Sequence, residues 1–502
     1  MRADYDIAIA GSGFAGSLLA MIARRLGKSV ILLERGKHPR FAIGESTTPL
    51  SNLLLEELAT RYDLPNLLPL CKWGAWQQAY PHLVCGLKRG FTFYHHQPGR
   101  DPQRDDQLLV AASPHDGIAD THWYRADVDG FFVSEAQKAG VDYLEEVHLE
   151  SACELDDGVR LEGKRYGAPF AIHARFVVDA TGPRGFLHRA FALPEVPLPD
   201  MPPTQALYTH FTNVRRLEEL APSSGTPPYP VDDAAVHHVF HGGWIWVLRF
   251  ANGVTSAGVA ANFDLSDGAP AWERILDRFP TIRGQFASAE PIMPFVYAPR
   301  LSFRSGMIAG RRWALLPSAA GFVDPLLSTG FPLTLLGVTR LAEIFERGDS
   351  SLATYARQTE DELLATAGLI GALYAAMPNF SVFASLSLLY FAAASYSETA
   401  RRLGKPHLAG SFLLHDNPRF QMQPLLARAR TIRTEAEADA FHDEVRRFIE
   451  PFNVAGLGDA SRHNWYPAHA EDMLGAASKL GVSRDEMACV LDRCSFRAAS
   501  QP

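Results

Sequence analysis

The stretch Gly11-Ser12-Gly13-Phe14-Ala15-Gly16 decides the fold of this chain. The apolar run Tyr5–Ala10 precedes it, and the apolar, helix-forming run 17–26 follows it. A second apolar run at 30–33 ends in Glu34. A Gly-x-Gly-x-x-Gly segment between a strand and a helix, with an acidic residue about 20 residues further on, is the fingerprint of a dinucleotide-binding site. We therefore predict an α/β fold that begins with such a site.

Each glycine of this fingerprint has a physical task. Gly11 permits the tight turn, Gly13 lets the backbone approach a pyrophosphate, and Gly16 lets the helix pack closely on the strand. The N-terminus of the helix then stabilises the negative charge of the diphosphate. We expect Glu34 to accept hydrogen bonds from the hydroxyls of an unphosphorylated adenosine ribose.

Later segments indicate which dinucleotide is bound. Arg175-Phe176-Val177-Val178-Asp179-Ala180-Thr181-Gly182 resembles the second nucleotide-side strand of FAD monooxygenases of the hydroxybenzoate hydroxylase type. Within that resemblance, Arg125 stands where a flavin-contacting arginine is found, and Val147 stands where a residue touches the adenine. The order of these segments implies FAD and an FAD-binding Rossmann-like domain.

Four further segments carry a second and more specific resemblance. They are His38-Pro39-Arg40-Phe41-Ala42-Ile43-Gly44-Glu45-Ser46-Thr47-Thr48-Pro49, Leu87-Lys88-Arg89-Gly90-Phe91-Thr92-Phe93-Tyr94, Gly242-Gly243-Trp244-Ile245-Trp246-Val247-Leu248-Arg249-Phe250 and Gly321-Phe322-Val323-Asp324-Pro325-Leu326-Leu327-Ser328-Thr329-Gly330. The two tryptophans are two positions apart on a strand, so their indoles point the same way and are expected to wall one side of a cavity. Together these segments resemble the flavin-dependent halogenases, and within them the free-standing branch that acts on small phenols.

The resemblance implies a reaction with a lysine at its centre. In that family, reduced flavin and O2 give a C4a-hydroperoxide, halide attacks its distal oxygen, and hypohalous acid travels down a tunnel to a lysine beside the arene. Lys88 matches that catalytic lysine. An amine suits the task because its pKa drops readily on burial, whereas arginine stays charged. Lys72, in Lys72-Trp73-Gly74, is the alternative.

The resemblance also implies the cofactor, halide and substrate contacts. The segment 38–49 matches a strap over the flavin, and 321–330 matches a loop beneath the isoalloxazine. Consecutive backbone N–H groups form an anion-binding nest, so chloride or bromide is expected at Ser328, Thr329 and Gly330. The expected cofactor-binding residues are Gly11, Ser12, Gly13, Phe14, Ala15, Gly16, Glu34, Arg35, Arg40, Ile43, Gly44, Glu45, Ser46, Arg125, Val147, Ala180, Ser318, Asp324 and Pro325. The expected substrate-lining residues are Trp244, Trp246, Tyr390 and Phe391.

Three positions depart from the pattern of the family. Ser318 stands where flavoproteins of this fold usually carry an aspartate that binds the ribityl chain, which weakens the expectation of tight FAD retention. Arg249 replaces a proline after the tryptophan pair, which opens a route toward hydroxylation. Leu327 replaces a glutamate of the tryptophan halogenases. This last change favours an electron-rich phenol of the resorcinol or phloroglucinol type over tryptophan.

The composition suits a globular enzyme. The chain has 502 residues, of which 47% are hydrophobic, so it can bury a large core. Its net charge of −8 and the absence of a basic patch argue against nucleic acid as a partner. The dispersed residues Cys71, Cys85, Cys153, Cys489 and Cys494 lack metal-binding spacing and indicate reduced thiols in a cytoplasmic protein. Because a cofactor strand begins close to the N-terminus, we expect no signal or transit peptide.

We predict two regions along the chain. Residues 1–345 form the FAD domain, with sheet-rich substrate segments inserted near 75–125 and 195–305. Residues 346–502 form a mainly helical region that caps the substrate cavity. The uncharged segment 363–397 is interrupted by Pro378, Asn379 and several serines, so we expect buried helices there and no membrane span.

The sequence thus predicts an FADH2-dependent halogenase that chlorinates or brominates a small phenol. No second dinucleotide fingerprint is evident, so a separate NAD(P)H-dependent flavin reductase is expected to deliver the reduced flavin. A metal site is not expected, and a homodimer is left open. Two alternatives also remain open at this point: an FAD-dependent aromatic hydroxylase, and a non-catalytic homologue that binds flavin or an aromatic ligand.

Overall fold

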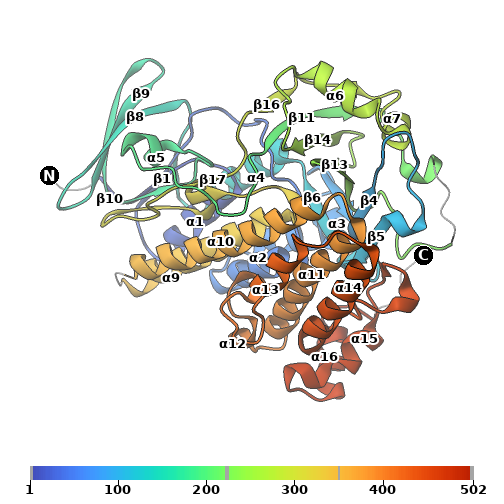
Figure 1. The fold of residues 1–502 in the computed structure, drawn as a ribbon. Helices are drawn as coiled ribbons and strands as arrows, with labels where there is room; N and C mark the ends of the chain where they lie inside the picture. The colour runs from blue at the N-terminus through green and yellow to red at the C-terminus, as the bar shows by residue number, and fades with distance from the viewer. Residues whose placement is uncertain (1–3, 221–224, 349–350, 498–502) are drawn as a thin grey trace.

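The computed structural model describes residues 4–220, 225–348 and 351–497. The described residues form two large β-sheets at opposite ends of the molecule, and a layer of long helices packs along them (Figure 1). The α/β class and the helical C-terminal region are confirmed.

The strands are β1 Tyr5–Ala10, β2 Val30–Leu33, β3 Cys85–Lys88, β4 Gly90–His95, β5 Gln107–Ala111, β6 Asp120–Trp123, β7 Asp142–Leu144, β8 Val147–Glu154, β9 Val159–Arg165, β10 Ala168–Asp179, β11 Gln205–Thr212, β12 Ala235–Phe240, β13 Gly243–Arg249, β14 Thr255–Ala261, β15 Glu290–Pro291, β16 Val296–Ala298, β17 Phe303–Arg304, β18 Trp313–Leu315, β19 Gly321–Phe322 and β20 Trp465–Tyr466. The α-helices are α1 Phe14–Arg25, α2 Pro49–Arg61, α3 Trp73–Ala79, α4 Arg125–Lys138, α5 Phe186–Ala190, α6 Ala269–Leu276, α7 Pro280–Gln285, α8 Pro317–Ala320, α9 Gly330–Arg347, α10 Leu352–Ala376, α11 Phe380–Arg402, α12 Pro406–Ala409, α13 Gln423–Ala429, α14 Glu435–Ile449, α15 Ala470–Gly475 and α16 Arg484–Arg493.

The first sheet follows the order β7-β2-β1-β10-β9-β8, and β18 also pairs with β10. Strand β1 runs parallel to both β2 and β10. Every residue of β2 is buried, as expected for a parallel strand that is covered on both faces. Helix α1 begins just beyond the carboxyl end of β1, which is the edge at which open α/β sheets bind ligands.

The second sheet follows the order β15-β11-β14-β13-β12-β4-β5-β20, with β16 beside β11. Most of its strands come from two separate segments of the chain, and β20 adds a short edge from the C-terminal region. Strand β13, which carries the two tryptophans, lies between β12 and β14. Strand β3 instead pairs with β6 in a small two-stranded sheet, and this places Lys88 beside the larger sheet.

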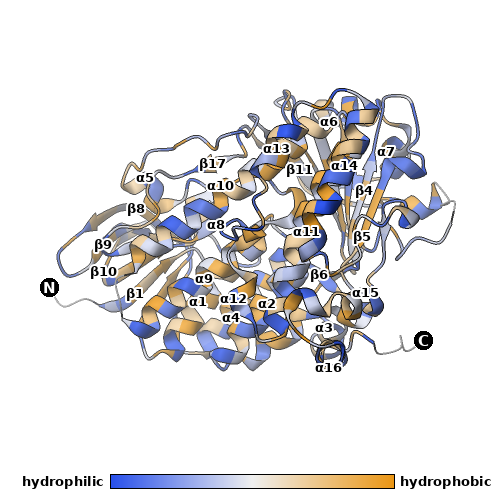
Figure 2. Cartoon of the chain, turned by 60° about the horizontal axis from the view of Figure 1, so that its bottom comes forward, coloured by the Kyte–Doolittle hydropathy of each residue, from blue (hydrophilic) through white to orange (hydrophobic). Residues whose placement is uncertain are grey.

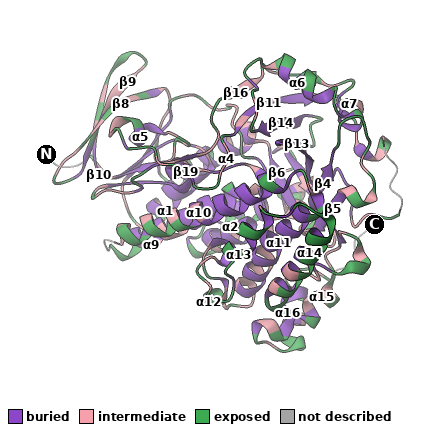
Figure 3. Cartoon of the chain, in the orientation of Figure 1, coloured by how far each residue is buried: buried purple, intermediate pink, exposed green. Residues whose placement is uncertain are grey.

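The C-terminal helices pack against both sheets. The interiors of α10 and α11 are buried, whereas α14 to α16 carry exposed residues on the outside of the molecule (Figure 3). Helix α14 carries both hydrophobic and hydrophilic residues along its length (Figure 2). Its buried residues Ala438, Phe441, Val445 and Ile449 form the apolar face that holds it in place.

Helix α11 is the one helix among the described residues that is long and apolar enough to cross a membrane by composition. However, 83% of its most apolar window is buried inside the structure. Apolar residues on all sides are typical of a helix in the core of a large protein. Its packing against α2, α10 and α14 therefore makes it a core helix.

Candidate active site

The glycine-rich turn has the geometry that the sequence predicts. Gly11 adopts a φ of +99°, and a Cβ atom at this position would lie 2.5 Å from the carbonyl oxygen of Ala180. A Cβ atom on Gly16 would lie 2.1 Å from the oxygen of Gly11, so only glycine lets α1 pack this closely on β1. At Gly13 the nearest atoms are the tips of side chains instead of backbone, which leaves its backbone approachable.

Glu34 lies at the carboxyl end of β2 and is held from several sides. The backbone N–H and the hydroxyl of Ser12 donate to its Oε2 at 3.1 Å and 2.8 Å, and Gly36 donates to its Oε1 at 2.9 Å. Burial alone would raise the pKa of Glu34, but the Arg40 guanidinium and these donors lower it overall. The carboxylate therefore stays ionised, as a ribose-binding acid must.

Two arginines gather above the turn. A Cβ atom on Gly13 would have the guanidinium groups of Arg125 and Arg40 as its nearest neighbours, at 3.4 Å and 3.7 Å. Arg125 donates to the carbonyl oxygens of Ile43 and Gly44 at 3.1 Å and 2.8 Å, so it ties the strap to α4. Both guanidinium groups also pair with the buried Asp129, which accepts the N–H of Phe14, so the site combines two cations and a helix N-terminus with one buried carboxylate.

The strap, residues 38–49, contains both exposed and buried residues. Ile43 and Gly44 are exposed, whereas Glu45 and Ser46 are buried. Four buried polar atoms along it have no hydrogen-bond partner among the described residues: His38 Nδ1, Arg40 Nε, Glu45 Oε2 and Ser46 Oγ. Buried polar groups are normally paired, so this row of atoms fits a polar cofactor laid against the strap.

The other expected cofactor residues lie around the same edge of the first sheet. Val147 is buried at the start of β8, and its N–H donates to the oxygen of Glu34 at 2.9 Å. Ala180 follows β10 directly, and half-buried Ser318 lies on α8. Arg35 is exposed. The residues of the dinucleotide fingerprint thus meet at one place, as their order in the sequence predicts.

The second glycine-containing loop leads into α9. Leu327 and Ser328 both adopt left-handed backbone angles, with φ of +64° and +53°. Asp324 lies at the start of the turn, next to Pro325, and accepts the N–H of Leu326 at 3.0 Å. No side chain caps the N-terminus of α9, and a Cβ atom on Gly330 would meet nothing within 4 Å. The backbone N–H groups at Thr329 and Gly330 therefore begin an uncapped helix whose positive end favours an anion.

Trp244 connects this loop to the C-terminal helices. Its indole N–H lies 3.2 Å from Asp324 Oδ1 and 3.2 Å from the Tyr374 hydroxyl, and Tyr374 donates to Asp324 Oδ2 at 2.9 Å. Burial raises the pKa of Asp324 to about 6, although these donors oppose the shift. The rings of Trp244 and Trp246 are 5.7 Å apart, and Trp246 reaches Ser256.

Lys88 is completely buried, with 0% of its surface exposed. Its Nζ donates to the carbonyl oxygen of Thr47 at 2.5 Å and lies 4.0 Å from the centre of the Phe91 ring. Thr47 is held against β6 because its hydroxyl and its backbone N–H both donate to the carbonyl oxygen of Thr121. Burial lowers the pKa of Lys88 to about 7, and the neighbouring Asp120 carboxylate opposes the shift.

Asp120 is paired with Lys88 in the register of β3 and β6. Its Oδ1 accepts a hydrogen bond from Asn52 at 2.7 Å. Burial raises the pKa of Asp120 to about 7, opposed by the charge of Lys88. The sequence pattern does not identify Asp120 as a site residue, because nothing in it shows that β6 will lie beside β3. The segment Asp120–Trp123 is itself mostly polar, so a charged residue at its start carries no signal.

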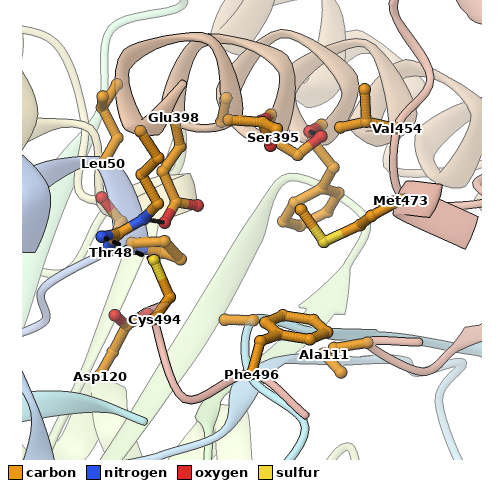
Figure 4. A pocket seen from close by; sticks show the side chains of 18 of the residues that line it. Thr48, Leu50, Ala111, Asp120, Ser395, Glu398, Val454, Met473, Cys494 and Phe496 are labelled. Atoms are coloured by element: carbon orange, nitrogen blue, oxygen red, sulfur yellow. Dashed lines mark hydrogen bonds and ion pairs between the residues drawn. The ribbon is translucent and has the colours of Figure 1, made fainter. Parts of the chain in front are cut away.

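A cavity of about 150 Å³ lies against this pair. Its walls include Asp120, Phe91 and Thr48, which all adjoin Lys88 or its acceptor, and helix α11 contributes Tyr390 and Phe391. Asp120 and Glu398 lie at one end of the cavity, while Met473 and Phe496 lie toward the other (Figure 4). A cavity of roughly 150 Å³ can hold a benzene-sized molecule.

The two candidate lysines differ in their position relative to the cavity, and so do the candidate aromatic residues. Lys72 is part of its wall, whereas Lys88 lies behind the wall, shielded from water. Trp244 and Trp246 do not line this cavity. Their indoles are directed toward Asp324, Tyr374 and Ser256 instead, between the second sheet and the loop that leads into α9. Arg249, on the same strand, donates to Asp232 at 2.7 Å.

The chain is similar to known halogenases. The family model described as tryptophan halogenase matches residues 120–380, and the chain therefore belongs to the flavin-dependent halogenase family. It is 31% identical over 355 residues to the monodechloroaminopyrrolnitrin halogenase PrnC of Pseudomonas fluorescens, an alignment that covers 67% of this chain and 61% of that relative. It is also 31% identical to the tetracycline 7-halogenase of Kitasatospora aureofaciens, over 66% of this chain and 61% of the relative. The chain thus spans about 61% of the length of these two relatives.

A solved structure matches nearly the whole fold. The crystal structure of halogenase PltM in complex with phloroglucinol and FAD aligns with a TM-score of 0.83 and 26% identity, and it covers 91% of this chain and 99% of that one. The agreement includes the helical C-terminal region, which makes up the last part of the aligned length. The expected family is confirmed.

Proposed function

We propose that this protein is an FADH2-dependent halogenase that chlorinates or brominates a small, electron-rich phenol. The observation that carries the proposal is the burial of Lys88 between the strap and the cavity. A lysine with no exposed surface and a lowered pKa, placed beside a cavity with aromatic residues in its wall, suits a reactive amine. A lysine that served only solubility would lie in water.

The residues at the first sheet fit FAD. The turn around Gly13, the ionised Glu34, the cations Arg40 and Arg125, and the unpaired polar atoms of the strap would hold its adenosine and diphosphate. The uncapped N-terminus of α9 at Thr329 would hold the halide. When bound and reduced, FAD together with O2 would supply the two-electron oxidation of that halide.

The remaining chemistry belongs to the side chains. The neutral amine of Lys88 would accept the electrophilic halogen, because its electron pair is free once the proton has left. The Thr47 carbonyl accepts a hydrogen bond from the Nζ, the Phe91 ring covers it, and the complete burial of Lys88 excludes water. The end of the strap, at Thr48 and Pro49, forms part of the cavity wall, so the strap and the cavity adjoin each other at Lys88.

The substrate class follows from the size and walls of the cavity. The known complex of PltM contains phloroglucinol, a small phenol. The walls here are largely apolar and include Phe91, Tyr390 and Phe391, which suits an aromatic ring. Leu327 also offers no carboxylate from the loop that precedes α9, so an indole amine would find no partner there.

The supply of reduced flavin is expected to come from a separate NAD(P)H-dependent reductase. A cytoplasmic location agrees with the five free cysteines, Cys71, Cys85, Cys153, Cys489 and Cys494.

The test is a reaction with a supplied flavin reductase, NADH, FAD, O2, bromide and a panel of phenols. We expect brominated phenols, detected by mass spectrometry through the bromine isotope pattern. Hydroxylated products without bromine would instead identify an aromatic hydroxylase. Flavin binding with no product and no flavin-dependent O2 consumption would identify a non-catalytic homologue.

A further inference from the structure

The cavity contains a carboxylate whose position suggests a role of its own. Asp120 is 4% exposed and lines the cavity, and it faces Lys88 across the β3–β6 pair. Asn52 engages its Oδ1, whereas its Oδ2 is buried and has no hydrogen-bond partner among the described residues. A buried carboxylate oxygen without a partner costs free energy, unless a ligand supplies a donor to it.

Three titratable groups near the cavity are already engaged, while Lys72, Tyr390 and His469 also belong to its wall. Glu398 is held by the Arg402 guanidinium at 2.7 Å. The rings of His122 and His237 are directed at the backbone oxygens of Ala234 and Thr92, and burial lowers the pKa of both to about 3. These imidazoles are therefore neutral near pH 7 and have little capacity as bases.

We propose that Asp120 accepts the hydrogen of the substrate's phenolic hydroxyl, so that it both orients the ring toward Lys88 and increases the ring's electron density. This role rests on the proposed function and adds the general base to it. Because Asn52 holds one oxygen of the carboxylate, the direction of the other oxygen is fixed as well, and Asp120 belongs to the cavity wall. A phenol held there would lie against the wall behind which Lys88 is buried.

The step balances without a further reagent. As the ring carbon attacks the halogen carried by Lys88, the C–X bond forms, the N–X bond breaks, and its electron pair stays on the lysine nitrogen. The phenolic proton passes to Asp120 at this point. The ring then loses its C–H proton to the lysine nitrogen, and Asp120 returns its proton to the phenolic oxygen. Asp120 is thus unchanged at the end of the cycle.

Burial supports this role for the carboxylate. It raises the pKa of Asp120 to about 7, while the charge of Lys88 opposes the shift. A base is most effective when its pKa lies near the working pH. Glu398 raises and Arg402 lowers this pKa from α11, so both faces of the cavity contribute to it.

The experiment uses the variant Asp120→Asn, which keeps the size of the side chain and removes its basicity. Wild type and variant are compared on a series of phenols whose pKa ranges from about 10, the ordinary value for a phenol, to values below the assay pH. The measured quantity is the ratio of variant to wild-type kcat/KM for each phenol. Because both enzymes act on the same phenol, the intrinsic reactivity of each ring cancels in this ratio.

For phenols that are un-ionised at the assay pH we expect a loss of about 100-fold, the lower range for general acid–base catalysis. For phenols that are already ionised we expect a ratio close to one. A ratio that is equally low for all phenols would overturn the proposal. A carboxylate that only supports the structure, or only changes the pKa of Lys88, would affect every phenol alike, whatever the pKa of the phenol.

Two controls keep these outcomes separate. Asp116→Asn removes a nearby, half-exposed carboxylate that pairs with Arg89, and it should give a constant ratio near one. Halide oxidation by Asp120→Asn, measured with a thiol trap, should match wild type and thereby show an intact fold. If wild type makes no halogenated product at all, the proposed function fails; if it does and the Asp120→Asn ratio is flat, only the role of Asp120 fails.

Discussion

The protonation state of Lys88 should control halogen transfer, and a change of pH tests this. Burial lowers the pKa of this amine to about 7. Its neutral fraction then rises from about 9% at pH 6 to about 91% at pH 8, whereas a lysine with a pKa of about 10.4 would be only about 0.4% neutral at pH 8. If the neutral amine accepts the halogen, transfer becomes about tenfold faster across this range.

The neighbouring Asp120 titrates with Lys88 as a pair, so the observed midpoint belongs to both groups. The other titratable groups that interact with this pair include Glu398, Arg402, His122, His237 and Tyr390. The substrate for this measurement should be the dimethyl ether of resorcinol, which has no ionisable hydroxyl. Neither the substrate nor its contact with Asp120 then contributes to the profile.

The assay is a rapid-quench measurement of halogenated product from enzyme supplied with reduced FAD, bromide and O2, at pH values from 5.5 to 9.5. Flavin oxidation is followed in parallel, so that a change in cofactor chemistry is recognised. We expect the transfer rate to rise with pH to a plateau, with a midpoint near 7. A midpoint above about 9, the region of ordinary lysines, would refute the lowered pKa and the reactive-amine role together.

Two further substitutions test the cofactor frame and the link to the C-terminal helices. Gly16→Ala places a Cβ atom 2.1 Å from the oxygen of Gly11, so we expect a loss of FAD binding in a flavin fluorescence titration. A variant with wild-type affinity for FAD would contradict the close packing of α1 on β1. Trp244→Phe removes the indole N–H that lies between Asp324 and Tyr374. We expect the free energy of unfolding to fall by about 1–3 kcal/mol, measured as a lower midpoint in urea unfolding. An unchanged midpoint would show that this hydrogen-bonded group does not contribute to stability.

The parts of the structure that depend on neighbouring residues were predictable from the sequence. The turn from Gly11 to Gly16 follows from short-range sterics, because two of its positions leave no room for a Cβ atom. Helix α14 follows from the spacing of its apolar residues.

The parts that depend on long-range pairing were not predictable. Asp120 and Lys88 are 32 positions apart, and only the antiparallel register of β3 and β6 brings them together. Tyr374 reaches Asp324 from α10 because of the way the C-terminal helices pack. Phe496 reaches the wall of the cavity from the end of the described chain. No periodicity in the sequence encodes such contacts, which depend on the assembled fold.

The most direct measurement compares Lys88→Ala with Lys72→Ala under identical conditions, and it follows halide oxidation and arene bromination separately. Lys88→Ala should still oxidise bromide, detected with a thiol trap, while brominated phenol falls below detection. Lys72→Ala, which alters the cavity wall only, should retain bromination. Full bromination by Lys88→Ala, or its loss in Lys72→Ala alone, would show that the buried amine is not the residue that delivers the halogen.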